Sequence, residues 1–115
     1  MARIISLSRG KGLSVRVRHE LCGREGVTTV LHYILLDASS ERLAEGAVEI
    51  TPDADVHVGR TVVEVPMTAV QEHDIWGALL EIGEVVVLRW RIELRDASGV
   101  LLARKSFGCE YRAPF

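Results

Sequence analysis

Two side chains near the start of the chain, His19 and Cys22, have the three-residue spacing that is typical of zinc ligands. Side chains three positions apart on a β-strand point to opposite faces, and the surrounding residues alternate as in a strand. No second close pair of ligands accompanies them, so we expect no metal site and no cofactor. An alternative is a small metal-binding protein or enzyme that uses His19, Cys22, His32 and His57.

A cluster of polar and aromatic side chains lies in segment 67–83, where the strand pattern fails. Its members Glu72, His73, Asp74 and Trp76 could bind a ligand. The indole of Trp76 would then stack on a sugar ring. In the more ordinary interpretation, which we favour, Trp76 covers the open edge of the fold and the three polar residues face water. Carbohydrate binding through Trp76 is kept as an alternative function.

Arginine outnumbers lysine by twelve to two. Four arginines are expected on the outward faces of strands, namely Arg16, Arg18, Arg89 and Arg91. If those strands were neighbours, the four side chains would form a surface ridge that could bind carboxylates or phosphates. The more ordinary expectation is pairing with glutamates across strands, at about 0.2–1 kcal/mol for each pair. The candidate partners are Glu20, Glu49, Glu64 and Glu93.

Other catalytic motifs are missing from the sequence. It has no Gly-x-Ser-x-Gly motif, and neither cysteine lies at a predicted helix start, where thiols become reactive. The ten glycines are scattered over turns and form no phosphate-binding loop. Carboxylates alternate with arginines as on solvated strand faces, so no acid–base pair can be identified. We expect that the chain is not an enzyme.

Alternation of apolar and polar residues indicates the strands that must position these side chains. The pattern is clearest in segments 83–96 and 13–21, while segment 27–36 is apolar on both faces, as in a central strand. Further strands are predicted at 42–51, 56–66 and 100–112. The predicted core consists of Val15, Val17, Val30, Ile34, Leu36, Val63, Val65, Leu88, Trp90, Ile92, Leu94 and Phe107.

Turn-forming stretches separate the predicted strands. They lie at 23–26, 37–40, 51–55 and 96–99. Segments 37–45 and 96–104 share five identities in nine positions, and each begins with an Asp-Ala-Ser turn. Both segments are therefore predicted to be hairpins.

The composition supports an all-β fold. Val, Ile and Thr contribute 27 of the 115 residues, and β-branched side chains favour sheet over helix. Closely spaced strands with tight turns predict an antiparallel β-sandwich of about seven strands. We expect an N-terminal arm at 1–12, the β-sandwich domain at 13–112 and a C-terminal tail at 113–115.

Several segments together resemble a known family. They are Ser14-Val-Arg-Val-Arg-His-Glu-Leu21, the strand 30–36, Thr61-Val-Val-Glu-Val65, Ile75-Trp76, the strand 86–94, Asp96-Ala-Ser-Gly99 and Lys105-Ser-Phe-Gly-Cys-Glu-Tyr-Arg112. This order resembles the immunoglobulin-like sandwich domain of glycoside hydrolase family 2 enzymes. That domain has a Leu-Trp pair before a long strand, an Asp-x-x-Gly hairpin and a Phe-Gly-Phe-Arg ending.

The match to that family has two departures. The family usually has prolines around the Leu-Trp segment, where this chain has Ala78-Leu-Leu-Glu-Ile-Gly83, and the ending here is longer. The resemblance implies an immunoglobulin-like sandwich without catalytic residues, because the family's catalytic groups lie on a separate barrel. It therefore implies a non-catalytic binding or assembly module, like the accessory domain of a glycoside hydrolase.

Charge and hydropathy exclude some partners. Fourteen basic and sixteen acidic residues give a net charge of −2, so we expect neither nucleic acid nor a membrane as a partner. The N-terminal segment lacks the apolar stretch of a signal peptide, because it is interrupted by Ser6, Ser8 and Arg9. We expect a cytoplasmic protein with reduced cysteines. Its expected partner is another protein or a second copy, bound through an edge strand.

Overall fold

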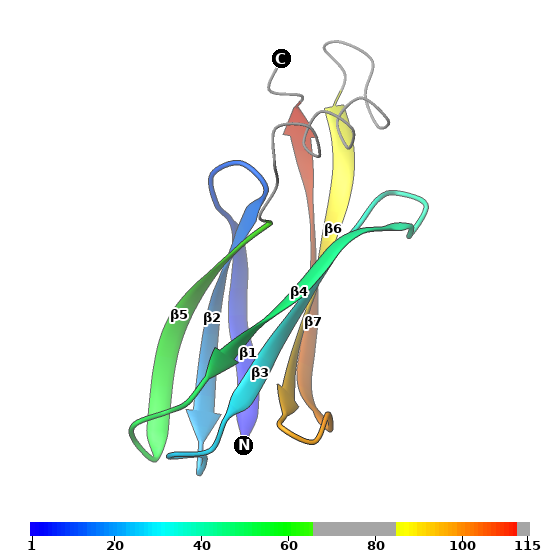
Figure 1. The fold of residues 1–115 in the computed structure, drawn as a ribbon. Coiled ribbons are helices and arrows are strands. Elements are labelled where there is room, and N and C mark those ends of the chain that lie inside the picture. Colours follow the sequence, from blue (N-terminus) through cyan, green and yellow to red (C-terminus); the bar gives the residue numbers. More distant parts are fainter. Residues whose placement is uncertain (66–84, 113–115) are drawn as a thin grey trace.

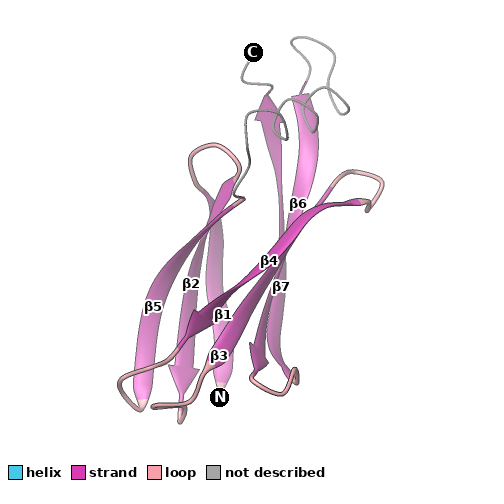
Figure 2. Cartoon of the chain, viewed as in Figure 1, coloured by secondary structure: helices cyan, strands magenta, loops and turns pink. Residues whose placement is uncertain are grey.

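Seven β-strands and their connecting loops make up the part of the chain that the computed structural model describes, residues 1–65 and 85–112 (Figure 2). The strands are β1 (Ala2–Arg9), β2 (Ser14–Cys22), β3 (Thr29–Leu36), β4 (Arg42–Ile50), β5 (Val56–Glu64), β6 (Val85–Asp96) and β7 (Leu101–Arg112). Within these two ranges, no helix is long and apolar enough to cross a membrane.

The strands form two antiparallel sheets (Figure 1). Sheet A has the order β1-β2-β5, and sheet B has the order β4-β3-β6-β7. β5 follows β4 in the chain but belongs to the other sheet, so the connection between them crosses from sheet B to sheet A. This architecture confirms the predicted all-β, immunoglobulin-like sandwich.

The two sheets are linked along the side where β1 lies close to β7. Arg9 of β1 donates a hydrogen bond from Nη1 to the backbone oxygen of Glu110 at 2.8 Å. Lys105 of β7 donates to the backbone oxygen of Ile5 at 3.4 Å. β4 and β5 are therefore the outer strands that lie away from this link.

Apolar side chains from both sheets fill the space between them. Nine of the twelve predicted core residues are buried: Val15, Val17, Leu36, Val63, Val65, Leu88, Trp90, Ile92 and Leu94. Phe107 is only partly buried and packs against this core. The alternation in segments 13–21 and 83–96 thus identified the inward faces of β2 and β6 correctly.

The prediction for β3 was wrong about which face is inward. Leu31, Tyr33 and Leu35 are buried in the core, while Val30 and Ile34 are only partly buried. β3 lies between β4 and β6, and both of its faces are apolar. Periodicity therefore contained no signal that could distinguish the core face from the outer face.

The segment predicted as an N-terminal arm, 1–12, contains strand β1. The pairing of β1 with β2 shifts by one residue between Ile4 and Ser6, which is a β-bulge at Ile5. The bulge places Ile4 and Leu7 against the core on either side of the irregularity. Because the bulge interrupts the alternation, period-2 analysis did not identify this strand.

The two Asp-Ala-Ser segments form matching hairpin turns in sheet B. Asp37 accepts hydrogen bonds through Oδ1 from the backbone N–H groups two and four residues later, at 2.9 and 2.8 Å. Asp96 does the same at 2.9 Å for both bonds. The fourth residue of each turn has a positive φ, 62° at Ser40 and 94° at Gly99. The predicted hairpins are confirmed.

Candidate functional site

The outer face of sheet A carries three arginines on neighbouring strands. Arg18 of β2 lies directly opposite Arg60 of β5 in the antiparallel register, and Arg16 lies two residues before Arg18 on β2. All three side chains are exposed. The sheet thus brings together positive charges from distant parts of the sequence.

Two serine hydroxyls of β1 complete this surface. β1 flanks β2 on the side away from β5. Ser6 is the register partner of Arg18, and Ser8 is the register partner of Arg16. The bulge at Ile5 produces this arrangement, because it turns Ser6 and Ser8 outward and leaves Leu7 toward the core. Without the extra residue, an isoleucine would lie opposite Arg18.

These side chains surround a shallow hollow of about 240 Å³. Its lining residues are Ser6, Ser8, Arg16, Val17, Arg18 and Arg60. We call this surface the arginine hollow. It contains hydrogen-bond donors from three guanidinium groups and two hydroxyls, and its lining includes no carboxylate.

The predicted ridge of four arginines does not form. Arg16 and Arg18 lie on β2 in sheet A, whereas Arg89 and Arg91 lie on β6 in sheet B. The condition for the ridge was that the two strands are neighbours, and they belong to different sheets. Arg60 is instead the third member of the cluster with Arg16 and Arg18.

Two of the glutamates that were expected to pair with these four arginines form ion pairs with other arginines among the described residues. Glu20 forms an ion pair with Arg3 at 3.2 Å, and the hydrogen bond from Arg3 holds the pKa of Glu20 below its ordinary value. Glu93 lies 3.3 Å from Arg95 and 4.0 Å from Arg104.

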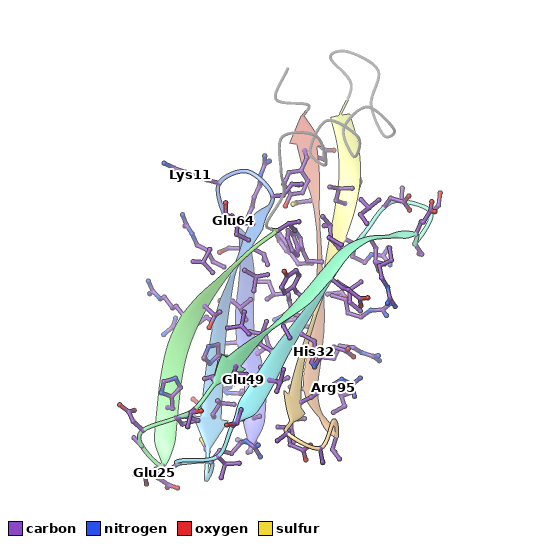
Figure 3. All side chains as sticks on the ribbon, viewed as in Figure 1. Lys11, Glu25, His32, Glu49, Glu64 and Arg95 are labelled. Atoms are coloured by element: carbon purple, nitrogen blue, oxygen red, sulfur yellow. The ribbon has the colours of Figure 1, made fainter. Side chains whose placement is uncertain are left out.

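None of the ion pairs formed between described residues includes an arginine of the hollow. Glu49 and Glu64 are likewise absent from those ion pairs, and Glu64 lies on β5 (Figure 3). The expected cross-strand pairs are therefore wrong for Arg16 and Arg18. The same holds for Arg89 and Arg91 on sheet B.

Two of the four candidate metal ligands come together, and the other two lie elsewhere. The rings of His19 and His57 stack with centroids 5.8 Å apart. Cys22 is on the opposite face of β2 from His19, where its thiol donates to Glu20 at 3.7 Å. His32 is on β3 in sheet B (Figure 3). Within residues 1–65 and 85–112, no group of three His, Cys, Asp or Glu side chains could hold a metal ion.

His19 is a buried histidine with one hydrogen-bonded nitrogen. Its Nε2 atom lies 3.0 Å from the hydroxyl of Thr61, and Nδ1 is buried with no hydrogen-bond partner among the described residues. Burial lowers the pKa of His19, and the nearby His57 lowers it further. A Cβ at Gly59, the register partner of His19, would press on both imidazole rings.

The polar and aromatic cluster Glu72, His73, Asp74 and Trp76 lies outside the described residues. The carbohydrate site that it could form therefore stays a prediction.

Sequence reasoning missed three residues of the arginine hollow: Ser6, Ser8 and Arg60. The serines carried a signal, since they flank Leu7 at alternate positions in the manner of an outward strand face. Arg60 carried none, because its neighbours Gly59 and Thr61 give no indication of which strand will pair with β5.

No protein-family model matches this sequence, and no curated protein matches it either. Among solved structures, the chain is similar to a glycosyl hydrolase family 2 member from Bacteroides cellulosilyticus DSM 14838, with a TM-score of 0.53 and 10% identity. It also matches a β-glucuronidase from Ruminococcus gnavus in complex with D-glucuronic acid, with a TM-score of 0.39 and 16% identity.

Each of these two matches covers 93% of this chain and 15% of the solved structure. The chain therefore corresponds to a small part of the larger proteins that it resembles. The match to the glycosyl hydrolase family 2 member confirms, as a likeness of fold, the resemblance that the sequence suggested.

Proposed function

We propose that this chain is a non-catalytic assembly module that docks through the free edge of sheet A. The observation that carries the proposal is the position of β5, which is the last strand in the order β1-β2-β5. Among the described strands, only β2 pairs with β5. The unpaired N–H and C=O groups of an edge strand are a template for pairing with another strand.

The outward side chains of β5 favour docking. Val56, Val58 and Val62 are 60%, 51% and 61% exposed, and they share the outward face of β5 with the exposed Arg60 and Glu64. The other free edge, β4, carries exposed Arg42, Glu45 and Glu49. Charged side chains on an edge strand oppose pairing with other chains. Both edges carry them, but only β5 also carries exposed valines, so β5 is the more favourable edge for docking.

A second copy of the chain is the partner that we propose. Two β5 strands can pair antiparallel about a two-fold axis, and the two copies of sheet A then form one continuous sheet. In the register that places Val58 opposite Val62 of the second copy, these valines meet across the junction, and the two Arg60 side chains also lie opposite each other. Each β-branched pair of this kind adds about 0.2–1 kcal/mol.

The likeness of fold favours the role of an accessory module over a catalytic role. Chains of this size correspond to one small part of the glycoside hydrolase family 2 structures, so we propose that catalysis, where it occurs, belongs to a separate domain that this module accompanies. We also propose a cytoplasmic location, with Cys22 and Cys109 as free thiols.

Sedimentation velocity over a wide range of protein concentration tests the proposal. We expect a monomer–dimer equilibrium that the double variant Val58→Lys/Val62→Lys shifts to monomer. The control is Ala47→Lys, which adds a charge at an exposed position of β4 and leaves the dimer unchanged. A monomer at every concentration would exclude pairing of β5 with a second copy. Hydrolysis of nitrophenyl glycosides by the purified chain would contradict the non-catalytic role.

A further inference from the structure

The arginine hollow places like charges opposite each other without a compensating carboxylate. Arg18 and Arg60 are direct register partners, and like charges at such positions destabilise an antiparallel pair. One row further along the same face, Arg3 lies opposite Glu20 and the two form an ion pair. The sheet thus balances the charges of Arg3 and Glu20, whereas the charges of Arg18 and Arg60 leave an excess of positive charge.

The register groups the donor residues around one hollow on three adjacent strands rather than along a single strand. Arg16 and Arg18 lie on β2 and Arg60 on β5, so the three positions form a triangle. The hydroxyls of Ser6 and Ser8 lie across β2 from β5. A guanidinium group carries five N–H donors and no acceptor, and a serine hydroxyl can also donate. A ligand in this hollow therefore needs several acceptor oxygens and negative charge.

We propose that the arginine hollow binds a tetrahedral oxyanion, a phosphate or sulfate group, either free or as the ester group of a small ligand. The planar guanidinium fork matches such groups in a bidentate manner. The hollow of about 240 Å³ holds the anionic group and leaves the rest of an ester outside. Binding of an anion would offset the repulsion between Arg18 and Arg60.

An acidic protein segment is a poorer fit to the same surface. An extended acidic peptide presents carboxylates along a line, and it would be matched by arginines repeated along one strand. Only Arg16 and Arg18 have that arrangement here, while Val62 is the register partner of Arg16 on β5. The enclosing serines, which the bulge in β1 turns outward, also suit a small group better than a peptide chain.

Calorimetric titration of the full chain with sodium phosphate and sodium sulfate tests this inference, with sodium acetate and sodium chloride at matched ionic strength as references. We expect saturable binding of phosphate or sulfate and none of acetate. Phenyl phosphate and phenyl sulfate distinguish an ester group from the free anion. Poly-glutamate is included as the acidic-peptide probe, and saturable binding of poly-glutamate without binding of phosphate or sulfate would overturn the proposal.

Variants locate the site. Arg18→Gln and Arg60→Gln should each weaken binding about tenfold or more, because each removes hydrogen bonds between charged groups. Arg89→Gln removes an exposed arginine from sheet B and should leave binding unchanged. Chemical shift changes of backbone amides should centre on Ser6, Ser8 and Arg18. Equal weakening by Arg89→Gln, or shift changes centred elsewhere, would contradict the assignment.

Thermal unfolding supplies a second readout that separates a site from a general salt effect. In chloride, Arg60→Gln should raise Tm, since it removes one of two opposed like charges. In phosphate or sulfate, the natural chain should gain Tm and the variant should not. A natural chain with the same Tm in phosphate, sulfate and chloride would overturn the inference.

Discussion

The indole nitrogen of Trp90 donates a hydrogen bond to the phenol oxygen of Tyr111 at 2.9 Å, inside the core. The guanidinium of Arg9 lies over the ring of Tyr111, 4.4 Å from its centroid. These contacts connect β6, β7 and β1, and therefore both sheets. Burial, and next a hydrogen bond with Cys109, raise the pKa of Tyr111 to about 12. The phenol therefore stays neutral over the physiological pH range.

Replacing Trp90 with alanine should be among the most damaging single changes in the chain. The side chain is fully buried, and truncation of a buried tryptophan costs about 3–5 kcal/mol through lost burial and the cavity that remains. Tyr111→Phe should cost less, about 1–3 kcal/mol, because it leaves the buried indole N–H without the phenol oxygen as acceptor. Urea unfolding at equilibrium measures both values.

The double variant Trp90→Phe/Tyr111→Phe, compared with the single variants Trp90→Phe and Tyr111→Phe, provides the control for that hydrogen bond. If the bond contributes, the double variant should lose less stability than the sum of the two single variants. Strict additivity would show that Trp90 and Tyr111 contribute independently. A loss below about 1 kcal/mol for Trp90→Ala would exclude this residue from the core.

The two Asp-Ala-Ser turns allow a matched exchange at one backbone position. Ser40 and Gly99 both have positive φ, and this conformation is strained for any residue with a Cβ. Ser40→Gly should therefore raise the free energy of unfolding by about 1 kcal/mol, and Gly99→Ser should lower it by a similar amount. Opposite signs in chemical denaturation are the expected result, and equal signs would show that the two turns differ.

Gly46 should not tolerate alanine, although its backbone conformation does not require glycine. It is the register partner of Tyr33, and a Cβ at this position would overlap the phenol ring. Since Tyr33 is 7% exposed and packed in the core, the ring has little room to move. Gly46→Ala should cost about 1–3 kcal/mol through overpacking, measured as a shift in the urea midpoint.

Gly108 in β7 is the matched control for that substitution. A Cβ there would meet only the backbone oxygen of Leu88 at 3.9 Å, an ordinary contact. Gly108→Ala should leave stability unchanged or raise it by about 0.5–1 kcal/mol, since alanine loses less chain entropy on folding than glycine. A comparable loss in both variants would show that crowding by Tyr33 is not the cause.

Stability should fall as the pH drops below about 6.5, the ordinary pKa of histidine. Burial lowers the pKa of His19 in the folded chain, so below that pH the unfolded chain binds a proton that the folded chain does not. The loss should continue until the pH reaches the lowered pKa of the folded state. Denaturant unfolding between pH 7.5 and about 5 measures this slope.

His19→Gln should flatten that slope, because glutamine stays neutral and can still form a hydrogen bond with Thr61. His57 stacks on His19, and Asp53 lies 4.0 Å from His57, so both residues are kept in the variant. His32→Gln makes the same change on sheet B and should preserve the slope. An unchanged slope in His19→Gln would assign the pH dependence to other groups.

Local chemistry in the sequence determined much of the fold. The alternation around Trp90 identified the inward face of β6, because successive side chains of any strand point to opposite faces. The aspartates of the two hairpins were readable for a similar reason, since a turn is stabilised by residues within four positions of each other. Both faces of β3 are apolar, so alternation could not distinguish its inward face from its outward face.

The arginine hollow depended on pairing between strands that are far apart in the sequence. Nothing local to Arg60 indicates that β5 will pair with β2, and nothing local to Arg89 indicates that β6 belongs to the other sheet. The bulge at Ile5 is likewise visible only in the register of β1 against β2, and it alone turns Ser6 toward Arg18. The sequence by itself determined most of the residues that lie on strands and in turns, with strand β1 as the exception. The tertiary structure decided which of them are neighbours, because register and sheet order depend on how all seven strands bury their apolar faces together.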